Sequence, residues 1–189
     1  MNKSELRKEY MSKRIALSPE RRQSYSEKIC ENFLSHFQVE GKLISLFLPI
    51  EKKLEINTYL LLERLQNLGA NICLPKSDFS SHDMQHIVYE ASTVLETNDY
   101  GIPEPKKGYR IEVDRIAIVI VPLLICDESG QRVGYGKGFY DRFLSQCSPQ
   151  CKFVGVNYFE PIAKIDNVLK EDIPLHALIT PEKIIHFNS

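Results

Sequence analysis

The chain has 189 residues, of which 43% are hydrophobic and 26% are charged, and its formal net charge is −1. This composition is typical of a globular protein with a buried core, and we expect residues 1–189 to form a single domain. The near-zero charge argues against electrostatic binding to nucleic acid or to a membrane surface, so any anion site has to be local.

The N-terminal residues are charged and lack the apolar segment of a signal peptide, and no apolar run approaches the length of a membrane span. The five cysteines contain no C-x-x-C pair, and no zinc-site spacing follows Cys147 and Cys151. We therefore expect a cytoplasmic protein with reduced thiols, and the sequence indicates no obligate protein partner.

Two helices are predicted at the start of the chain, on the outside of the fold. In the first, KSELRKEYMSKRIAL, the apolar side is formed by Leu6, Tyr10 and Leu17. The second begins with Ser18 as N-cap and Pro19 at the first helical position. Its apolar residues then recur every fourth position from residue 25 to residue 37.

Short apolar segments follow, and they alternate with helical ones. Strands that end at proline are predicted for KLISLFLPI and NICLP, with a helix over INTYLLLERLQNLG between them. A further strand is predicted for MQHIVYE, followed by a loop over NDYGIPEPKKGYR. The unbroken run IAIVIV predicts a fully buried central strand.

The last third of the chain adds a helix over FYDRFLSQC and strands over CKFVGVNY, HALIT and KIIHF. Strands and helices that alternate in this way favour a parallel sheet with helices on both faces. The predicted fold is therefore a three-layer α/β/α sandwich with a mainly parallel central sheet.

A glycine-rich stretch, GYGKGFYDRFL at residues 134–144, follows the predicted central strand and opens a helix. Ligands of open α/β sheets bind at the carboxyl ends of strands, where glycine N–H groups and a helix N-terminus favour an anion. Lys137 adds a full positive charge, so the stretch predicts a phosphate site. It matches neither GxxxxGK[ST] nor GxGxxG, and the alternative is a tight turn with a solvent-exposed lysine.

Asp141 falls in the first turn of the predicted helix. Since Mg²⁺ bound to nucleotide phosphates commonly needs only one or two carboxylates, Asp141 is a candidate magnesium ligand. The alternative is a carboxylate that only complements the helix dipole. Arg142 either pairs with phosphate or faces water, and the sequence does not separate these two roles.

The stretch VPLLICDESGQRVGYGKGFYDRFL closely resembles a motif of the 5-formyltetrahydrofolate cyclo-ligase family, also called methenyltetrahydrofolate synthetases. Three other segments resemble further motifs of that family in the expected order, namely KSELRKEYMSKRIALSPE, ISLFLPIEKKLEINT and YGIPEP. The resemblance therefore covers nearly the whole chain. It implies a sheet similar to that of some sugar-phosphate isomerases and CoA transferases. It also implies a ligase of one-carbon metabolism that uses ATP and Mg²⁺.

The implied reaction converts 5-formyltetrahydrofolate and ATP into 5,10-methenyltetrahydrofolate, ADP and phosphate. The formyl oxygen attacks the γ-phosphate, N10 adds to the activated carbon, and phosphate leaves as the ring closes. Such an enzyme has to position two substrates and neutralise phosphate charge, and it needs no nucleophile of its own. The sequence agrees in that it shows no Ser-His-Asp or Cys-His arrangement.

The resemblance also assigns site residues. It places the ATP site on Lys3, Ser4, Glu5, Leu6, Arg7, Arg132, Val133, Gly134, Tyr135, Gly136, Lys137, Gly138, Phe139 and Tyr140. It makes Arg7 and Lys137 the catalytic residues, and Asp141 and Asp172 the magnesium ligands. It places the folate site on Ile50, Glu55, Tyr135 and Phe139, with the Glu55 carboxylate as an acceptor for pterin N–H groups.

Each assignment has a plainer alternative. Lys3 and Arg7 are four positions apart, so one helix face presents both, but such a pair is also typical of a solvated basic helix end. Glu55 is alternatively an ordinary loop carboxylate, and Phe139 a core side chain.

The chain departs from the family at His176, where an aspartate near the metal is frequent. Mg²⁺ disfavours a neutral imidazole, so either Asp172 takes this role or Asp141 and phosphate oxygens suffice.

Two other functions stay open on the sequence. One is a folate-binding module without turnover, which the presence of all the implied charged site residues disfavours. The other is a sugar-phosphate isomerase or transferase on a similar sheet, which would need an acid/base pair beside the glycine-rich stretch.

Overall fold

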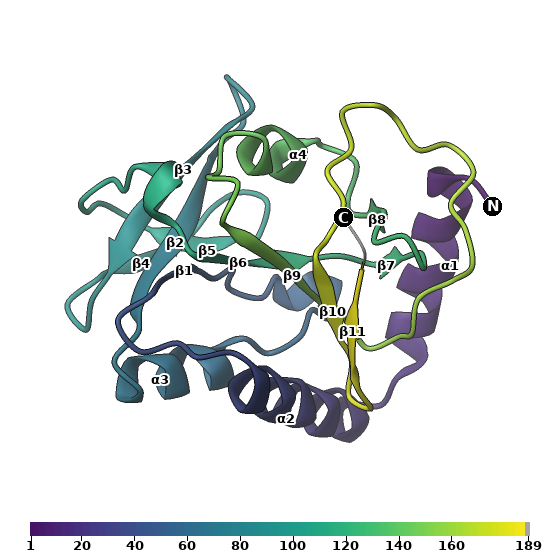
Figure 1. The fold of residues 1–189 in the computed structure, drawn as a ribbon, viewed down its shortest axis with the longest axis horizontal. Helices are drawn as coiled ribbons and strands as arrows, with labels where there is room; N and C mark the ends of the chain where they lie inside the picture. The colour runs from purple at the N-terminus through teal and green to yellow at the C-terminus, as the bar shows by residue number, and fades with distance from the viewer. Residues whose placement is uncertain (188–189) are drawn as a thin grey trace.

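The computed structural model describes residues 1–187, and its centre is a seven-stranded sheet in the order β11-β10-β9-β6-β1-β2-β3 (Figure 1). The strands are β1 Leu43–Ser45, β2 Asn71–Asp78, β3 Asp83–Tyr89, β6 Ile118–Pro122, β9 Lys152–Val156, β10 Ala177–Ile179 and β11 Ile184–His186. The inner strands from β10 to β2 are parallel, and the edge strands β3 and β11 are antiparallel to their neighbours. The predicted mainly parallel α/β sheet is confirmed.

Helices cover both faces of this sheet (Figure 1). On one face lie α2 Pro19–His36 and α3 Tyr59–Asn67, which contact each other as well as strands β10 and β2. The other face is covered by the short helix α4 Phe139–Leu144, which contacts β3. The first helix, α1 Lys3–Ala16, stands at one end of the sheet beside a small hairpin.

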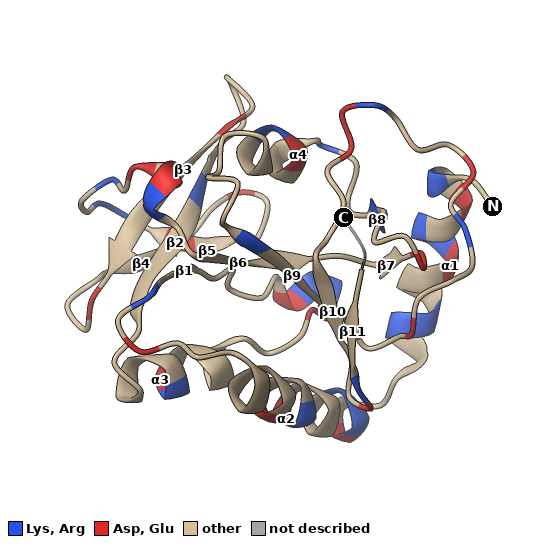
Figure 2. Cartoon of the chain, in the orientation of Figure 1, with Lys and Arg blue, Asp and Glu red and all other residues tan. Residues whose placement is uncertain are grey.

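Strand β6 lies at the centre of the sheet, as the apolar run predicted. Ile118 and Ile120 pack into the core under α2 and α3, whereas Val119 and Val121 pack into the core under α4. Because successive side chains of a strand point to opposite faces, both faces of β6 have to be apolar. The strand therefore reads as a continuous apolar run and carries no charged residue (Figure 2).

The prediction that the second strand ends at proline was wrong, because β2 continues through Pro75 to Asp78. On one side β1 ends at Ser45, which pairs with Cys73, so β1 needs no N–H group at Pro75. On the other side β3 pairs with β2 over its whole length. A proline is tolerated at such a position because its missing N–H faces no ladder partner.

Two small hairpins were not predicted. One joins β4 Leu95–Thr97, just before the expected Gly- and Pro-rich loop, to β5 Pro103–Pro105 within that loop. The other joins β7 Ile125–Cys126 to β8 Arg132–Val133, so the glycine-rich stretch follows β8 and not the central strand directly. Two short 3₁₀ helices, η1 Glu51–Lys53 and η2 Val113–Arg115, complete the fold.

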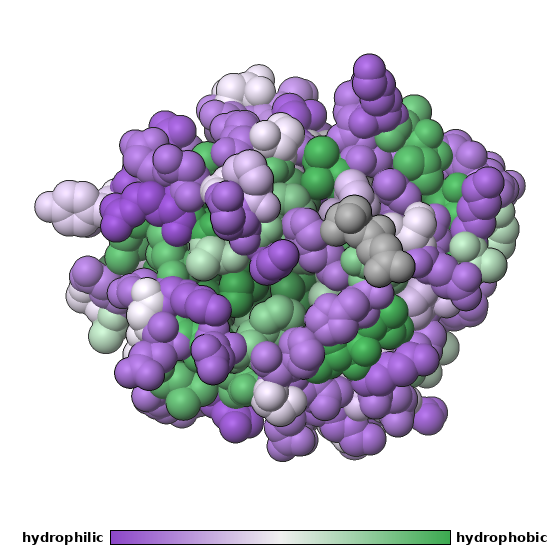
Figure 3. All heavy atoms as spheres, in the orientation of Figure 1, coloured by the Kyte–Doolittle hydropathy of each residue, from purple (hydrophilic) through white to green (hydrophobic). Residues whose placement is uncertain are grey.

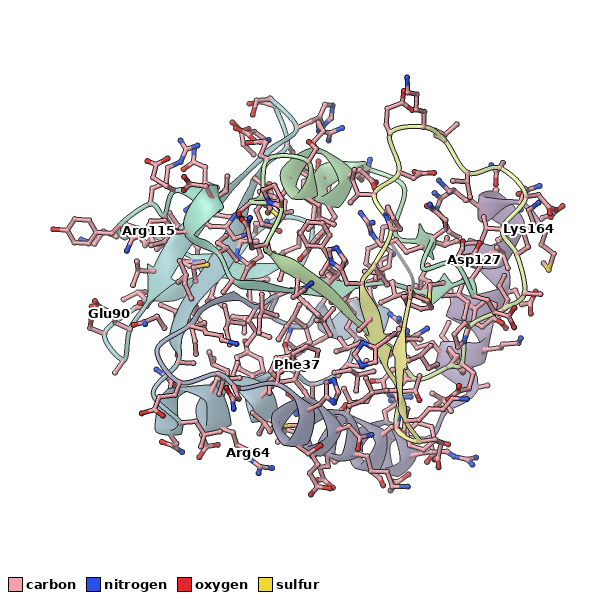
Figure 4. All side chains as sticks on the ribbon, in the orientation of Figure 1. Phe37, Arg64, Glu90, Arg115, Asp127 and Lys164 are labelled. Carbon is pink, nitrogen blue, oxygen red and sulfur yellow. The ribbon has the colours of Figure 1, made fainter. Side chains whose placement is uncertain are left out.

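A buried carboxylate holds the second hairpin in place. Asp127, labelled in Figure 4, lies in the turn between β7 and β8 and is 2% exposed. Its Oδ1 accepts hydrogen bonds from the backbone N–H groups of Ser129 and Gln131, and its Oδ2 accepts one from Ile165. These bonds fix the start of the glycine-rich stretch relative to the segment around residue 165.

Helix α1 is less peripheral than its position in the chain suggests. Leu6 and Tyr10 pack against the β7–β8 hairpin, and the third buried residue on this face is Arg14, not the expected Leu17. Leu17 is the C-cap and packs against the core under α2. The helix therefore delivers a charged side chain to the interior.

The surface is ordinary for this composition. The face seen in Figure 3 is mostly hydrophilic and is interrupted by separate apolar patches. No helix within residues 1–187 has the length and apolar character that a membrane span requires.

Candidate active site

A cavity of about 1030 Å³ opens at the carboxyl ends of β1, β2 and β6, where ligands of open α/β sheets bind. It is bounded by the N-terminal turns of α1, residues 47–55, the β2–β3 and β4–β5 hairpins, the glycine-rich stretch and residues 167–173. Most of the predicted site residues line it: Lys3, Ser4, Arg7, Ile50, Glu55, Arg132, Gly134, Tyr135, Gly136, Lys137, Gly138, Phe139, Tyr140, Asp141 and Asp172. Segments far apart in the sequence therefore meet at one place.

Three predicted residues are not among those that line the cavity. Leu6 and Val133 are buried in the small core between α1 and the β7–β8 hairpin. The Glu5 carboxylate accepts a hydrogen bond from the Asn2 N–H group and completes the capping box of α1. Each of these side chains is used to build the local structure that holds its neighbours at the cavity.

The glycine-rich stretch has an unusual backbone. Gly136 has φ +84° and Gly138 has φ +70°, a region that residues with a Cβ rarely adopt. The carbonyl of Gly134 accepts a hydrogen bond of 2.9 Å from Arg7 Nε, which joins α1 to the stretch. Gly138 is the N-cap of α4, but this helix has only 6 residues, so its dipole contributes less to an anion site than predicted.

The open question about Arg142 has a structural answer. Its Nε donates to the His82 carbonyl and its Nη2 donates to the Lys137 carbonyl, each at 2.9 Å. Arg142 thus ties the glycine-rich stretch to the β2–β3 turn. Lys137 is exposed at the cavity and forms no ion pair with any of the described residues.

Both predicted magnesium ligands pair with cations at the cavity. Asp141 Oδ1 accepts from Arg132 Nη2 at 2.8 Å and from the Ile173 N–H group at 3.1 Å. Asp172 forms an ion pair with Lys3, in which both side chains are nearly buried. Burial lowers the pKa of Arg132, while the negative charges of Asp141 and Asp172 act to raise it.

The carboxylates fit a particular kind of magnesium site. Within residues 1–187 no cluster of three or more His, Cys, Asp and Glu side chains could form a metal cage. Mg²⁺ bound to nucleotide phosphates needs only one or two carboxylates, because phosphate oxygens and water supply its other ligands. Asp141 and Asp172 meet that requirement of one or two carboxylates, but they do not suffice for a site built from protein side chains alone.

The carboxylate of Glu55 is held by two hydrogen bonds at the cavity. Its Oε2 accepts from the Ile50 N–H group at 2.7 Å, and its Oε1 accepts from the Tyr135 hydroxyl at 2.6 Å. Burial raises the pKa of Glu55, and these two hydrogen bonds oppose that rise. Glu55 is therefore a fixed acceptor and not a mobile loop carboxylate.

An aromatic wall that the sequence analysis did not identify stands near Phe139. The rings of Phe79 and Tyr100 stack with centroids 3.7 Å apart at 16°, and Phe79 meets Phe139 edge to face at 5.0 Å. All three rings line the cavity, so Phe139, 9% exposed, serves both the core and the site. Tyr100 begins the YGIPEP motif, which was a usable sign, whereas Phe79 lies in a hairpin tip without one.

His176 is not part of the cavity lining. It begins the turn into β10, and its Nδ1 accepts a hydrogen bond of 2.8 Å from the Phe153 N–H group. Burial lowers the pKa of its imidazole. The residue therefore serves the sheet, and the acidic position that the family resemblance led us to expect there has no counterpart at this site.

A model of the 5-formyltetrahydrofolate cyclo-ligase family matches residues 1–176. The chain belongs to this family. The 5-formyltetrahydrofolate cyclo-ligase of Escherichia coli strain K12 is 32% identical over 178 residues, which cover 91% of this chain and 96% of that protein. The 5,10-methenyltetrahydrofolate synthetase of Aquifex aeolicus has a solved structure that matches with a TM-score of 0.83 at 30% identity, over 100% of this chain and 94% of that one.

A second solved structure shows the shared fold alone. The 5,10-methenyltetrahydrofolate synthetase of Mycoplasma pneumoniae matches with a TM-score of 0.75 at 24% identity, over 96% of this chain and 100% of that one. Membership in the 5-formyltetrahydrofolate cyclo-ligase family confirms the predicted resemblance and the enzyme class, a ligase of folate one-carbon metabolism.

Proposed function

We propose that the chain catalyses the ATP- and Mg²⁺-dependent cyclisation of 5-formyltetrahydrofolate to 5,10-methenyltetrahydrofolate, with release of ADP and phosphate. The observation that carries the proposal is that a cationic glycine-rich stretch and a fixed carboxylate, Glu55, line one cavity. Its volume of about 1030 Å³ lies at the upper end of the roughly 300–1,000 Å³ of single-ligand pockets, which is suitable for two substrates side by side.

The phosphate groups of ATP would lie against the glycine-rich stretch. Lys137 and Arg7 are placed to neutralise charge on the transferred phosphoryl group, and the backbone of residues 134–138 lets N–H groups approach it. Lys3 and Arg132 also line the cavity, where they pair with Asp172 and Asp141. When bound, Mg²⁺ would neutralise phosphate charge, and Asp141 and Asp172 are the side chains that would hold it.

The folate would lie between Glu55 and the aromatic wall. The carboxylate of Glu55 has two oxygens and accepts one hydrogen bond at each, so lone pairs remain for the N–H groups of a pterin edge. Ile50 and the rings of Phe139, Phe79 and Tyr100 offer the apolar surface that a flat heterocycle requires.

The chemistry then needs positioning more than a protein nucleophile. The formyl oxygen attacks the γ-phosphate and ADP leaves. N10 then adds to the activated formyl carbon and loses its proton, and phosphate departs as the C–O bond breaks. Cations at the glycine-rich stretch would stabilise the negative charge of both departing groups. The protein does not have to form a covalent bond with either substrate.

The test mixes the purified protein with 5-formyltetrahydrofolate, ATP and Mg²⁺ and follows the ultraviolet absorbance of the methenyl product. We expect product only when all three are present, and a strong loss of kcat/KM for the folate in Glu55→Gln. The exposed Glu31→Gln on α2 is the matched control and should keep wild-type kinetics. Folate that binds without forming product would favour a binding module of the same fold. The absence of both folate binding and turnover would remove the proposal.

A further inference from the structure

Arg14 is a buried cation that no assignment above uses. It is 2% exposed, although it comes from helix α1 near the chain start. Its Nη2 donates to the Leu123 carbonyl at 2.7 Å, and its Nη1 donates to the Lys53 carbonyl at 3.3 Å and to the Tyr135 hydroxyl at 3.1 Å. One guanidinium therefore joins α1 to three separate segments around the cavity.

The chemistry of arginine sets the direction of the bond to Tyr135. A guanidinium has only donors, so the Tyr135 oxygen has to accept from Arg14. A phenol has one proton, and that proton is then free to point only to Glu55 Oε1, 2.6 Å away. The two hydrogen bonds of this Arg14–Tyr135–Glu55 series thus run in one direction, from the cation to the carboxylate.

The same hydrogen bonds also connect the buried positive charge of Arg14 to a negative charge. Arg14 forms no direct ion pair with a carboxylate among the described residues, and its Nε atom has no hydrogen-bond partner there. A buried cation without a nearby negative charge is costly, and Glu55 is the carboxylate to which it connects through one hydroxyl. Arg14 and Glu55 are therefore opposite charges connected through the Tyr135 hydroxyl.

We propose that Arg14 is a positioning residue that makes the Tyr135 hydroxyl a donor to Glu55 and so keeps the Glu55 carboxylate an acceptor for the N–H groups of the folate. The inference rests on the proposed function, because it assigns Glu55 to the folate. Arg14 does not line the cavity and acts only through Tyr135. Since Arg7 donates to the neighbouring Gly134 carbonyl, α1 contacts two successive residues at the start of the glycine-rich stretch.

Several titratable and charged groups lie around Glu55. Its own segment brings Lys53, and Tyr158, which follows β9, donates from its hydroxyl to the Glu55 carbonyl at 3.0 Å. The remaining titratable and charged groups that face it are Arg14 of α1, Tyr135 of the glycine-rich stretch and Tyr140 of α4. Arg14 and Lys53 favour the ionised carboxylate, so loss of Arg14 has to raise the Glu55 pKa.

The kinetic test compares Arg14→Gln, Arg14→Lys and Tyr135→Phe with the wild type. We expect Arg14→Gln and Tyr135→Phe to raise KM for 5-formyltetrahydrofolate about tenfold, with KM for ATP changed less than about threefold. The double variant should be no worse than the more impaired single variant, because Arg14 acts through Tyr135. Arg21→Gln removes a surface arginine that also donates to a tyrosine hydroxyl, that of Tyr25, and should behave as wild type.

The second test does not depend on turnover. The carboxyl carbon of Glu55, assigned by its absence in Glu55→Gln, is titrated by ¹³C NMR in the wild type and in each variant. We expect a higher Glu55 pKa in Arg14→Gln and Tyr135→Phe, and a smaller rise in Arg14→Lys, which keeps the charge. The acid limb of kcat/KM for the folate should move to higher pH by the same amount.

The outcomes separate the two proposals. A wild type without turnover removes the proposed function, whereas the NMR titration still tests Arg14. Turnover in the wild type with an unchanged Glu55 titration in Arg14→Gln overturns the role of Arg14. If Arg14→Gln does not fold, Tyr135→Phe provides the test. A Glu55 pKa in Tyr135→Phe that equals the wild-type pKa also overturns the role of Arg14.

Discussion

The guanidinium of Arg7 lies directly against Gly136. A Cβ atom built at Gly136 would stand 3.0 Å from Arg7 Cζ and 3.1 Å from its Nη2, which is tighter than nine in ten real Cβ contacts. Gly136 also has φ +84°. The position therefore favours glycine for its backbone conformation, and a Cβ there would require the Arg7 guanidinium to shift.

Gly136→Ala should accordingly displace Arg7 from the glycine-rich stretch. We expect kcat/KM for ATP to fall about tenfold or more, because a charge-assisted contact to phosphate is lost. Steady-state kinetics with ATP varied at saturating folate would check this.

Gly41→Ala is the matched control for that variant. Gly41 has φ +70°, but a Cβ there would meet nothing within 4 Å. It isolates the backbone strain, on the order of 1 kcal/mol, from the displacement of Arg7. Equal losses of activity in the two variants would contradict the role given to Arg7.

Lys137→Ala should raise KM for ATP about tenfold and lower kcat, because the cavity loses a full positive charge beside the phosphates. KM for the folate should stay close to the wild-type value. The exposed Lys42→Ala, outside the cavity lining, is the control. Wild-type kinetics in Lys137→Ala would be incompatible with a phosphate role.

Asp141→Asn should raise the Mg²⁺ concentration for half-maximal activity about tenfold. Asn can still accept the hydrogen bonds from Arg132 and Ile173, so the change removes charge with little change of shape. Asp166→Asn alters an exposed carboxylate that pairs with the N-terminus and should leave the titration unchanged. A magnesium titration of Asp141→Asn that matches the wild type would exclude Asp141 as a ligand.

His86 makes a prediction about stability. Its ring is fully buried in β3, stacks on Phe143 at 4.0 Å, and has no hydrogen-bond partner for either nitrogen among the described residues. Burial lowers its pKa from 6.5 to about 3. Because the folded-state pKa is the lower one, its contribution to stability is complete above pH 6.5 and is lost as the pH falls towards 3.

His86→Phe should therefore reduce the loss of stability between pH 7 and pH 4, by on the order of 3 kcal/mol. At pH 7 it should raise Tm by about 2–6 °C, since two unpaired nitrogens are no longer buried. Thermal melts from pH 7 to pH 4 check both effects, with the exposed His36→Gln as control. If the Tm of His86→Phe falls with pH as much as that of the wild type, groups other than His86 cause the acid sensitivity.

Much of the scaffold is predictable from local pattern. The apolar repeat of α2 and its Ser18 cap act within a few residues, and the unbroken run of β6 follows from burial on both faces. The β4–β5 and β7–β8 hairpins and the passage of β2 through Pro75 escaped prediction. Their stability depends on partners supplied by other segments, which a local pattern does not contain.

The features of the site likewise divide into those that the sequence predicts and those that it does not. Residue types, their order in the chain and the family resemblance already identify nearly half of the residues that line the cavity, because glycine, lysine and carboxylate groups in a motif carry their chemistry with them. The chain order does not reveal that Lys3 pairs with Asp172 at a separation of 169 positions, or that Arg14 is buried behind Tyr135. Charge–charge and hydrogen-bond energies depend on distance and burial. The tertiary structure alone therefore decides which charges are paired and which face the cavity.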